Sequence, residues 1–378
     1  MTAEPDGRAR RYVTARQNMI VRALSSVGAD TFPHYAEGTS GQWTHTPNGD
    51  WTGSFYVGQL WLIAQANDAA DLRDLATRWA RLLKTRVGSD TVFRGFLFWY
   101  GVAIGADGNA ELTQLALAGA HALAGTYNPR AGLIPLGASA EEATNVGNAE
   151  TNIDTVPATV LLLNWATQTT GDSRFRDIAV RHAAAHARLC VHDDGHVSQS
   201  ATFDPITGAL TRRYTHKGFS DTSTWARAQA WAMLGFTHAS QLDPEQFLPI
   251  AVRVSDWWIS HLPDDHVAIW DFDAPNHPEA LKDTSATAIA AAALLKLASL
   301  SPLHAERYNV VATDMIDALI HRHLTGDNDP QRRPAGMLLD GCYNHRLKLA
   351  SASELIWGDY YLLESLHQLT GRLTTTEI

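Results

Sequence analysis

The apolar positions of the chain follow a helical period over most of its length. One run near the middle spaces its large side chains as they would lie on one face of an α-helix. This run comprises Ile153, Val156, Val160, Leu161 and Trp165. The segment 286–300 is apolar almost all round, which is typical of a helix buried on every side. The segments 71–84 and 174–189 each keep one polar face and predict outer helices.

Turn residues separate roughly a dozen helical segments of ordinary length. A single β-hairpin is predicted, with arms at 196–203 and 209–214 and a turn at 204–208. Buried and amphipathic helices alternate without the pattern of a parallel sheet, which favours two concentric helical layers. A helical solenoid is the alternative, but no fixed repeat period accompanies the alternation. We expect residues 1–378 to form one domain.

Composition narrows the function classes. The 378 residues are 45% hydrophobic and carry a net charge of −10. This acidic surplus argues against nucleic acid, because a phosphate backbone attracts Lys and Arg. No apolar run is long enough for a membrane span, and the polar segment 1–17 lacks the core of a secretory signal. Cys190 and Cys342 make neither a disulfide framework nor a metal cluster. We expect a cytoplasmic protein with reduced cysteines and no cofactor.

Several motifs combine tryptophan with Asp, Arg and Gly in ways that packing alone does not demand. The chain has 12 tryptophans, and an indole is costly to bury because its N–H needs a partner. Such rings often lie against sugar faces in carbohydrate pockets. The six motifs are Trp51-Thr52-Gly53-Ser54-Phe55, Asn152-Ile153-Asp154-Thr155, the stretch from Thr215-His216-Lys217 to Trp225-Ala226-Arg227 and Trp231, Trp270-Asp271-Phe272-Asp273, Asp283-Thr284-Ser285 and Trp357-Gly358-Asp359.

From Trp51 to Leu366, these motifs and their order resemble the unsaturated glucuronyl hydrolase family. The resemblance implies an all-α fold, the (α/α)6 barrel, in which inner and outer helices form a double toroid that carries a small β-hairpin. It also implies a glycoside hydrolase without metal or cofactor. The expected partner is an oligosaccharide that ends in an unsaturated uronic acid, as left by a polysaccharide lyase.

The implied chemistry differs from ordinary glycoside hydrolysis. The terminal uronate of the substrate has a C4=C5 double bond, which makes it a vinyl ether. An acid donates a proton to C4, water adds at C5, and the unstable hemiketal opens and releases the next sugar. Because the anomeric carbon is not attacked, the carboxylate pair of retaining and inverting glycosidases does not apply.

Asp154 matches the general acid and base of this family. Its position at the expected start of a helix has a second interpretation, because Asp is a favoured N-cap residue. The two roles require opposite shifts of the pKa. A helix N-terminus lowers the pKa of a carboxyl group, whereas a proton donor at neutral pH needs a raised pKa, which burial would supply.

The resemblance implies further pocket residues. Arg227 would bind the substrate carboxylate, because a guanidinium group contacts both oxygens at once. A structural ion pair with a nearby Asp is the alternative for Arg227, and a place in the core is the alternative for the matched His and Trp residues. The other matched or substituted pocket positions are Trp51, Gln199, His216, Lys217 and Trp231.

The pocket also departs from the family pattern. Family members carry a second essential carboxylate two residues before a Gly-Phe pair, and Phe93 stands at that place here. Asp90 lies three residues earlier and is the candidate to replace this carboxylate. The family's pocket tryptophan in the loop before Asp154 corresponds to Leu136. These changes indicate a retained scaffold with a partly rebuilt pocket.

A basic segment precedes the last motif, in the loop 341–353. We interpret His345, Arg346 and Lys348 as contacts to an anionic sugar next to the unsaturated one. A solvated surface is the alternative interpretation. Contacts of this kind at a wet pocket rim would be sensitive to salt.

Two other functions remain open for the same scaffold. A lyase or sugar epimerase would use a His or Tyr base, with Tyr100, His216 and Tyr343 as candidates. A catalytically inactive sugar-binding protein is the other possibility. His182 and His186 have i,i+4 spacing, but they lack further metal ligands nearby and are expected on a solvated face. The chain is compatible with a monomer or a homodimer.

Overall fold

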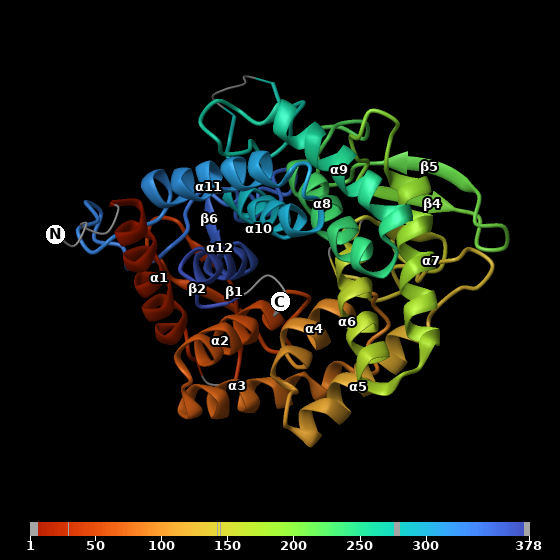
Figure 1. Cartoon of the computed structure of the whole chain (residues 1–378), viewed down its shortest axis with the longest axis horizontal. Coiled ribbons are helices and arrows are strands. Elements are labelled where there is room, and N and C mark those ends of the chain that lie inside the picture. Colours follow the sequence, from red (N-terminus) through yellow and green to blue (C-terminus); the bar gives the residue numbers. More distant parts are fainter. Residues whose placement is uncertain (1–6, 29, 142, 144, 276–279, 374–378) are drawn as a thin grey trace.

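Alternating inner and outer helices form a double ring (Figure 1). The structure is a computed structural model that describes residues 7–28, 30–141, 143, 145–275 and 280–373. The inner helices are α2 (Gly53–Asn67), α4 (Arg94–Tyr100), α6 (Thr155–Thr170), α8 (Ala226–Leu242), α10 (Thr284–Leu300) and α12 (Ile356–Leu369). The outer helices are α1 (Gly7–Ser25), α3 (Ala70–Leu82), α5 (Ala110–Ala124), α7 (Ser173–Cys190), α9 (Pro244–His261) and α11 (Ala305–Arg322).

The inner ring is closed, because each inner helix packs against the next and α12 returns to contact α2. Helices α6, α8 and α10 are buried on nearly all sides, whereas α3 and α7 bury one face only. The predicted (α/α)6 barrel is therefore confirmed. Its two layers follow from the two kinds of helix, because an all-round apolar helix needs neighbours on every side.

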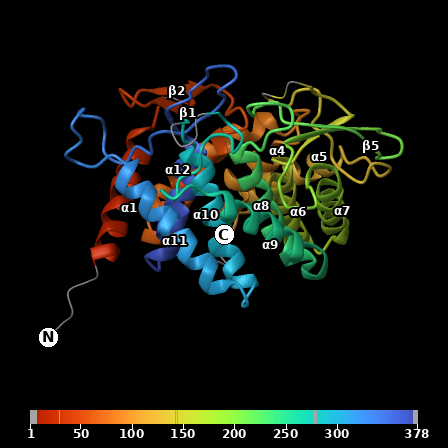
Figure 2. The same ribbon diagram turned by 90° about the horizontal axis from the view of Figure 1, so that it is seen from above.

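Two small antiparallel sheets and the loops around them lie at one end of the barrel (Figure 2). One sheet has the order β2-β1-β6, and the other has the order β3-β4-β5. The predicted hairpin is confirmed as β4 and β5. Its partner strand β3 and the other sheet were not predicted from the sequence. The strands are β1 (Phe32–Glu37), β2 (Trp43–Thr46), β3 (Glu150–Asn152), β4 (Ser200–Phe203), β5 (Leu210–Tyr214) and β6 (Ser353–Leu355), and two short 3-10 helices cover η1 (Leu83–Arg86) and η2 (Ala103–Gly105).

The inner helices begin at the end that carries the sheets. Strand β3 leads into α6 and β6 leads into α12, and each inner helix except α12 is followed by an outer helix that returns along the barrel. The amino ends of the inner ring therefore converge. Because a helix amino end carries partial positive charge, this end of an acidic protein favours an anionic ligand.

Close packing fixes the start of α4 against α6. A Cβ atom on Gly95 would lie 2.2 Å from the carbonyl oxygen of Ala158, so a larger side chain would push the two helices apart. Gly95 thereby holds the neighbouring aromatic residues Phe93 and Phe96 beside the start of α6.

Cys190 and Cys342 are both free and buried, and burial raises the pKa of each thiol to about 12. Such thiols are inert at neutral pH. Among the described helices, none has the length and apolarity that a membrane crossing requires.

Candidate active site

The sheet β3-β4-β5 gathers the predicted polar residues at one edge. Asp154 follows β3, Gln199 precedes β4, and His216 and Lys217 follow β5. Because neighbouring strands are antiparallel, the end of β3, the start of β4 and the end of β5 lie together. Residues more than 60 positions apart in the sequence thus meet at the amino end of α6.

A small cavity of about 10 Å³ lies at this edge. Its walls combine aromatic rings with charged and amide groups. That volume holds about one water molecule, so the side chains of the cavity walls lie close together. The lining residues are Trp51, Phe93, Phe96, Glu141, Asn152, Asp154 and Lys217.

Asp154 occupies the N-cap position of α6, but its side chain makes no capping hydrogen bond. The residue is 7% exposed, and its Oδ1 atom has no hydrogen-bond partner among the described residues. Burial raises the pKa of Asp154 to about 6, against the opposing positive charges of Lys217 and Arg227. The helix N-terminus would lower the pKa of Asp154, but the opposing effect of burial is larger. The carboxyl group can therefore hold a proton near neutral pH.

The prediction that His182 and His186 lie on a solvated face is wrong, because both are fully buried behind the start of α6. The backbone N–H of Ile134 donates to His182 Nδ1 at 3.0 Å, so His182 Nε2 carries the hydrogen toward the Thr155 hydroxyl at 3.1 Å. His186 Nδ1 donates to the carbonyl of His182 at 2.7 Å, and its Nε2 accepts from the Thr151 hydroxyl at 2.6 Å. Burial lowers the pKa of His186 to about 4. These neutral rings support the Asp154 turn, and the described part of the chain brings no three His, Cys, Asp or Glu side chains together to hold a metal.

Arg227 forms the structural ion pair that was its alternative interpretation. It is 1% exposed, and its Nη1 lies 2.5 Å from Asp283 Oδ2. Further hydrogen bonds go to the carbonyl oxygens of Cys342 at 2.7 Å and Tyr343 at 2.5 Å. The guanidinium also lies 4.4 Å from the ring centroid of Trp225. Arg227 is thus paired within the protein and is absent from the cavity lining, and its contact with substrate stays a prediction.

Lys217 supplies positive charge to the cavity wall. Its backbone N–H donates to Gln199 Oε1 at 3.0 Å, which fixes the residue beside Asp154. The ammonium group lies 5.7 Å from the ring centroid of Trp225 and 5.5 Å from that of Tyr343. Aromatic faces at this distance attract a cation and keep it close to the cavity.

Trp51 forms one aromatic wall, with its Nε1 donating to the Tyr343 hydroxyl at 3.1 Å and its ring 4.9 Å from that of Trp357. Other predicted contacts lie behind the wall. Trp231 is 1% exposed and packs 5.1 Å from Phe96, so it belongs to the core.

Gln199 and His216 also stand outside the cavity lining. Gln199 is fully buried and positions Lys217. His216 Nδ1 donates to the Ser200 hydroxyl at 2.9 Å, and that hydroxyl donates to Asn152 Oδ1 at 2.8 Å. Both residues therefore position cavity groups instead of lining the space themselves.

The structure does not bring Asp90 to the cavity, which corrects its predicted role. Asp90 is exposed, and its Oδ2 accepts from the backbone N–H of Ala138 at 2.9 Å. The second carboxylate in the cavity wall is Glu141. Sequence reasoning missed Glu141 because it lies in a loop outside every motif, where no spacing distinguishes it from a solvated acidic residue.

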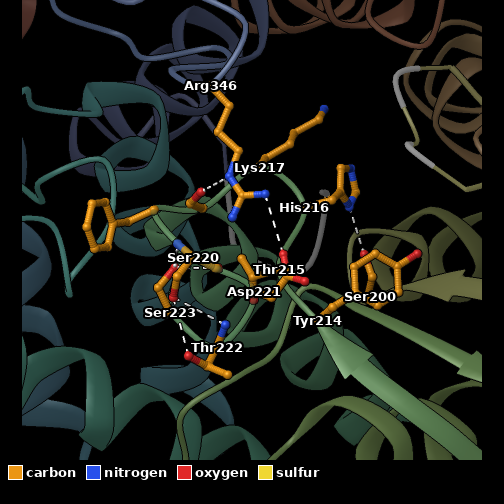
Figure 3. A network of polar contacts seen from close by, with 12 residues as sticks. Ser200, Tyr214, Thr215, His216, Lys217, Ser220, Asp221, Thr222, Ser223 and Arg346 are labelled. Carbon is orange, nitrogen blue, oxygen red and sulfur yellow. Dashed lines mark hydrogen bonds and ion pairs between the residues drawn. The ribbon is translucent and has the colours of Figure 1, made fainter.

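Arg346 joins the loop 341–353 to the segment that carries Lys217 (Figure 3). Its Nε donates to the carbonyl of Gly218, and its Nη1 lies 3.5 Å from Asp221 Oδ1. His345 and Lys348 are exposed, and the His345 ring lies 4.5 Å from that of Trp270. The basic loop thus serves in part to hold two segments of the protein together, because the positive charge of Arg346 is already paired with Asp221.

Asp271 holds the same segment through two hydrogen bonds. Its Oδ2 accepts from the backbone N–H of Phe219 at 2.8 Å and from the Ser223 hydroxyl at 2.7 Å. A Cβ atom on Gly218 would lie 2.5 Å from this oxygen, so the tight wrap requires glycine. Together Asp271 and Arg346 fix the backbone next to Lys217.

A wider hollow of about 570 Å³ lies elsewhere, on the outer helix α9, with Asp194, Trp257 and His261 among its lining residues. It is shallow, and it lies away from the polar groups that converge on the amino end of α6. The small cavity is the stronger candidate, because it contains a buried carboxyl group with a perturbed pKa beside a cation.

Known proteins of similar sequence share this architecture, although no protein-family model matches the chain. The chain is 32% identical to the unsaturated glucuronyl hydrolase of Bacillus sp. (strain GL1) over 368 residues, which cover 94% of this chain and 95% of the relative. It is 31% identical over 349 residues to the unsaturated chondroitin disaccharide hydrolase of Streptococcus pyogenes serotype M1, covering 86% and 82% of the two chains.

Solved structures of known proteins also match this fold. The structure of the unsaturated glucuronyl hydrolase from Bacillus sp. GL1 matches with a TM-score of 0.86 and 30% identity over 96% of each chain. An unsaturated glucuronyl hydrolase specific for heparin has the same TM-score at 23% identity, covering 96% of this chain and 97% of its own, and shows the shared fold. The protein is a glycoside hydrolase, and the chain belongs to the unsaturated glucuronyl hydrolase family.

Proposed function

We propose that this enzyme releases a 4,5-unsaturated uronic acid from the non-reducing end of lyase-generated oligosaccharides, with Asp154 as the proton donor. The observation that carries the proposal is the Asp154 carboxyl group, buried beside a cavity, with a pKa of about 6 and an unpartnered Oδ1. A carboxyl group in this state is a competent general acid near neutral pH. The names of the relatives support the substrate class.

Protonation of C4 by Asp154 starts the reaction. The positive charge that develops at C5 is shared with the ring oxygen, and water adds to C5 while the Asp154 carboxylate accepts its proton. The resulting hemiketal opens to a ketone at C5. The C1 carbon then carries a hydroxyl group and the glycosidic oxygen, and this hemiacetal breaks down to an aldehyde and the free sugar. Asp154 ends the cycle protonated.

Lys217 is our candidate to bind the substrate carboxylate in place of Arg227. It lines the same cavity as Asp154, and the converging amino ends of the inner helices add partial positive charge. Trp51 and Phe93 supply flat apolar walls for the sugar ring. The ring would lie with its carboxylate toward Lys217 and its double bond within reach of Asp154.

Two of the three bases predicted for a lyase or epimerase are engaged within the protein, and the third, His216, lies outside the cavity lining. Tyr100 is buried in the core, 2.5 Å from the hydroxyl of Tyr361, and burial raises its pKa well above the usual value. The Tyr343 hydroxyl accepts from the Trp51 indole. Incubation with a panel of lyase-generated disaccharides tests the hydrolase proposal. We expect loss of the double-bond absorbance, and tight binding with unchanged absorbance would contradict the proposal.

The pH dependence of kcat/KM should follow the protonation of Asp154. Its pKa of about 6 predicts that kcat/KM falls as the pH rises above 6, because the carboxylate cannot donate a proton. The charge of Lys217 lowers this pKa, so Lys217→Met should move the fall to higher pH. The same variant should raise KM roughly 10- to 100-fold through loss of a charge-assisted hydrogen bond. Lys84→Met, on the outer surface, is the control, and an unmoved pH profile in Lys217→Met would contradict the assignment.

Arg346→Ala should lower kcat/KM about fivefold, equally for sulfated and unsulfated disaccharides. The reason is that a partly exposed ion pair contributes about 1 kcal/mol, and its loss frees the backbone next to Lys217. Lys348→Ala should behave like wild type. A loss confined to sulfated substrates and largest at low salt would instead support the substrate contact predicted from the sequence.

A cytoplasmic location fits the cysteines. Both are free and buried, as is usual for proteins of reducing compartments. Fractionation of the producing cells, with activity on unsaturated disaccharides as the readout, should recover the enzyme with the cytoplasmic markers.

A further inference from the structure

We propose that Glu141 contacts the substrate and takes over the place of the carboxylate that is missing at Phe93. In this inference, which rests on the proposed function, the Glu141 carboxylate accepts hydrogen bonds from the ring hydroxyl groups of the unsaturated uronate. Glu141 and Lys217 would then orient the ring between them.

Three observations support a contact between Glu141 and the reacting ring. It lines the same small cavity as Asp154, Lys217 and Trp51. Phe93, which stands where the family's second carboxylate is expected, lines that cavity too. The Glu141 side chain is only 16% exposed, so it is not a solvated surface group.

The Glu141 carboxylate is held in one orientation. Arg86 forms an ion pair with its Oε1, and the Thr91 hydroxyl donates to its Oε2 at 2.9 Å. Arg86 is itself anchored, because it donates to the carbonyl oxygens of Asn48 at 3.1 Å and Asp50 at 2.7 Å. A carboxylate has about four acceptor positions, so about two stay available for a ligand.

The chemistry of the cavity indicates which part of the sugar Glu141 contacts. An ionised carboxylate accepts hydrogen bonds and donates none. The uronate ring offers hydroxyl donors at C2 and C3, whereas its own carboxylate carries like charge and would be repelled. The hydroxyl edge of the ring therefore belongs at Glu141 and the carboxylate edge at Lys217. Opposite charges on the cavity wall thus select one orientation and bring C4 toward Asp154.

A purely structural role as partner of Arg86 explains less. Arg86 keeps three hydrogen bonds without Glu141, to Asn48, Asp50 and the Ser89 hydroxyl at 2.9 Å. Arg86 therefore does not need the Glu141 carboxylate in order to stay in place. The loop gains a second anchor from this pair, but an anchor alone does not require the carboxylate to reach the cavity.

The test compares Glu141→Gln with wild type on the unsulfated unsaturated chondroitin disaccharide. We expect kcat/KM to fall roughly 10- to 100-fold, as for a lost hydrogen bond to a charged group, with an unchanged melting temperature. Asp90→Asn is the matched control and should keep wild-type kinetics. A disaccharide analogue that lacks the C2 hydroxyl of the unsaturated ring should react slowly with wild type and lose little further rate in Glu141→Gln.

The outcomes separate the two proposals. An active wild type with equal kinetics in Glu141→Gln overturns the role of Glu141 and leaves the proposed function standing. A rate loss that comes with a lower melting temperature and is the same for both disaccharides shows a structural role and also overturns it. A wild type that leaves the double bond intact across the whole disaccharide panel overturns the proposed function, and the assignment of Glu141 fails with it.

Discussion

Replacing Asp154 with asparagine is expected to lower kcat about a thousandfold, within the range typical for loss of a general acid. Asparagine matches the shape of the side chain but has no proton to donate to C4. Binding should change little, because the aromatic walls and Lys217 remain. The measurement is steady-state turnover of an unsaturated disaccharide, with substrate binding followed by calorimetry. Wild-type turnover in this variant would show that Asp154 is not the acid.

The melting temperature of the same variant at two pH values provides a control for folding. Burial raises the pKa of Asp154 from 3.8 to about 6, so the folded protein binds this proton more tightly than the unfolded chain does. The carboxyl group therefore costs no stability below pH 4, and above pH 6 the buried carboxylate costs about 3 kcal/mol. Asp154→Asn should melt at a higher temperature than wild type at pH 8 and at nearly the same temperature at pH 4. A variant that is less stable at both pH values would indicate a structural cap.

Arg227→Met is expected to destabilise the protein by about 3–5 kcal/mol, the usual effect of breaking a buried ion pair. The substitution leaves Asp283 charged and fully buried and removes two hydrogen bonds to the carbonyls at 342–343. Unfolding by denaturant, followed by fluorescence of the tryptophans, measures the change.

A matched control exists on the surface. Arg307 pairs with Asp256 at 2.9 Å, with side chains 48% and 38% exposed, and Arg307→Met should cost less than about 1 kcal/mol. If Arg227→Met keeps full stability and loses only substrate affinity, Arg227 binds the uronate as the sequence alone suggested.

The barrel could be predicted because the apolar pattern of each helix indicates whether that helix belongs to the inner or the outer layer. A helix such as α10, apolar on every side, has no stable place except between neighbours, and the one-sided α3 and α7 have no stable place except outside. The strand β3 was not predictable in the same way. It has three residues, and its pairing with β4 depends on a segment almost 50 positions away.

Within the candidate site, the sequence predicted only those cavity residues that lie in a recognisable motif. Asp154 and Lys217 lie in motifs, and the structure places both at the cavity. The pKa of Asp154 depends on burial by distant loops, which the sequence around it does not reveal. Arg227 shows the same limit, because its partner Asp283 lies 56 positions further on and competes with any ligand for the guanidinium.

Loop residues account for the remaining errors. The polar pattern of α7 suggested a solvated face at His182 and His186, but the segments at 134 and 151–155 cover that face. Asp90 was the nearest carboxylate in sequence to the missing one, whereas Glu141 is the carboxylate at the cavity. Distance along the chain is a poor guide when a long loop folds back over the barrel.

If Asp154 protonates C4 of an unsaturated uronide, the glycosidic bond breaks only as a consequence of that step. The direct measurement follows double-bond absorbance and release of the reducing sugar in the same reaction, in D2O, with product analysed by NMR at early times. We expect one double bond to be lost for each sugar released and deuterium to enter at C4, and we expect neither change with Asp154→Asn. Sugar release with the double bond intact would rule out protonation at C4, because it would place the attack at the anomeric carbon.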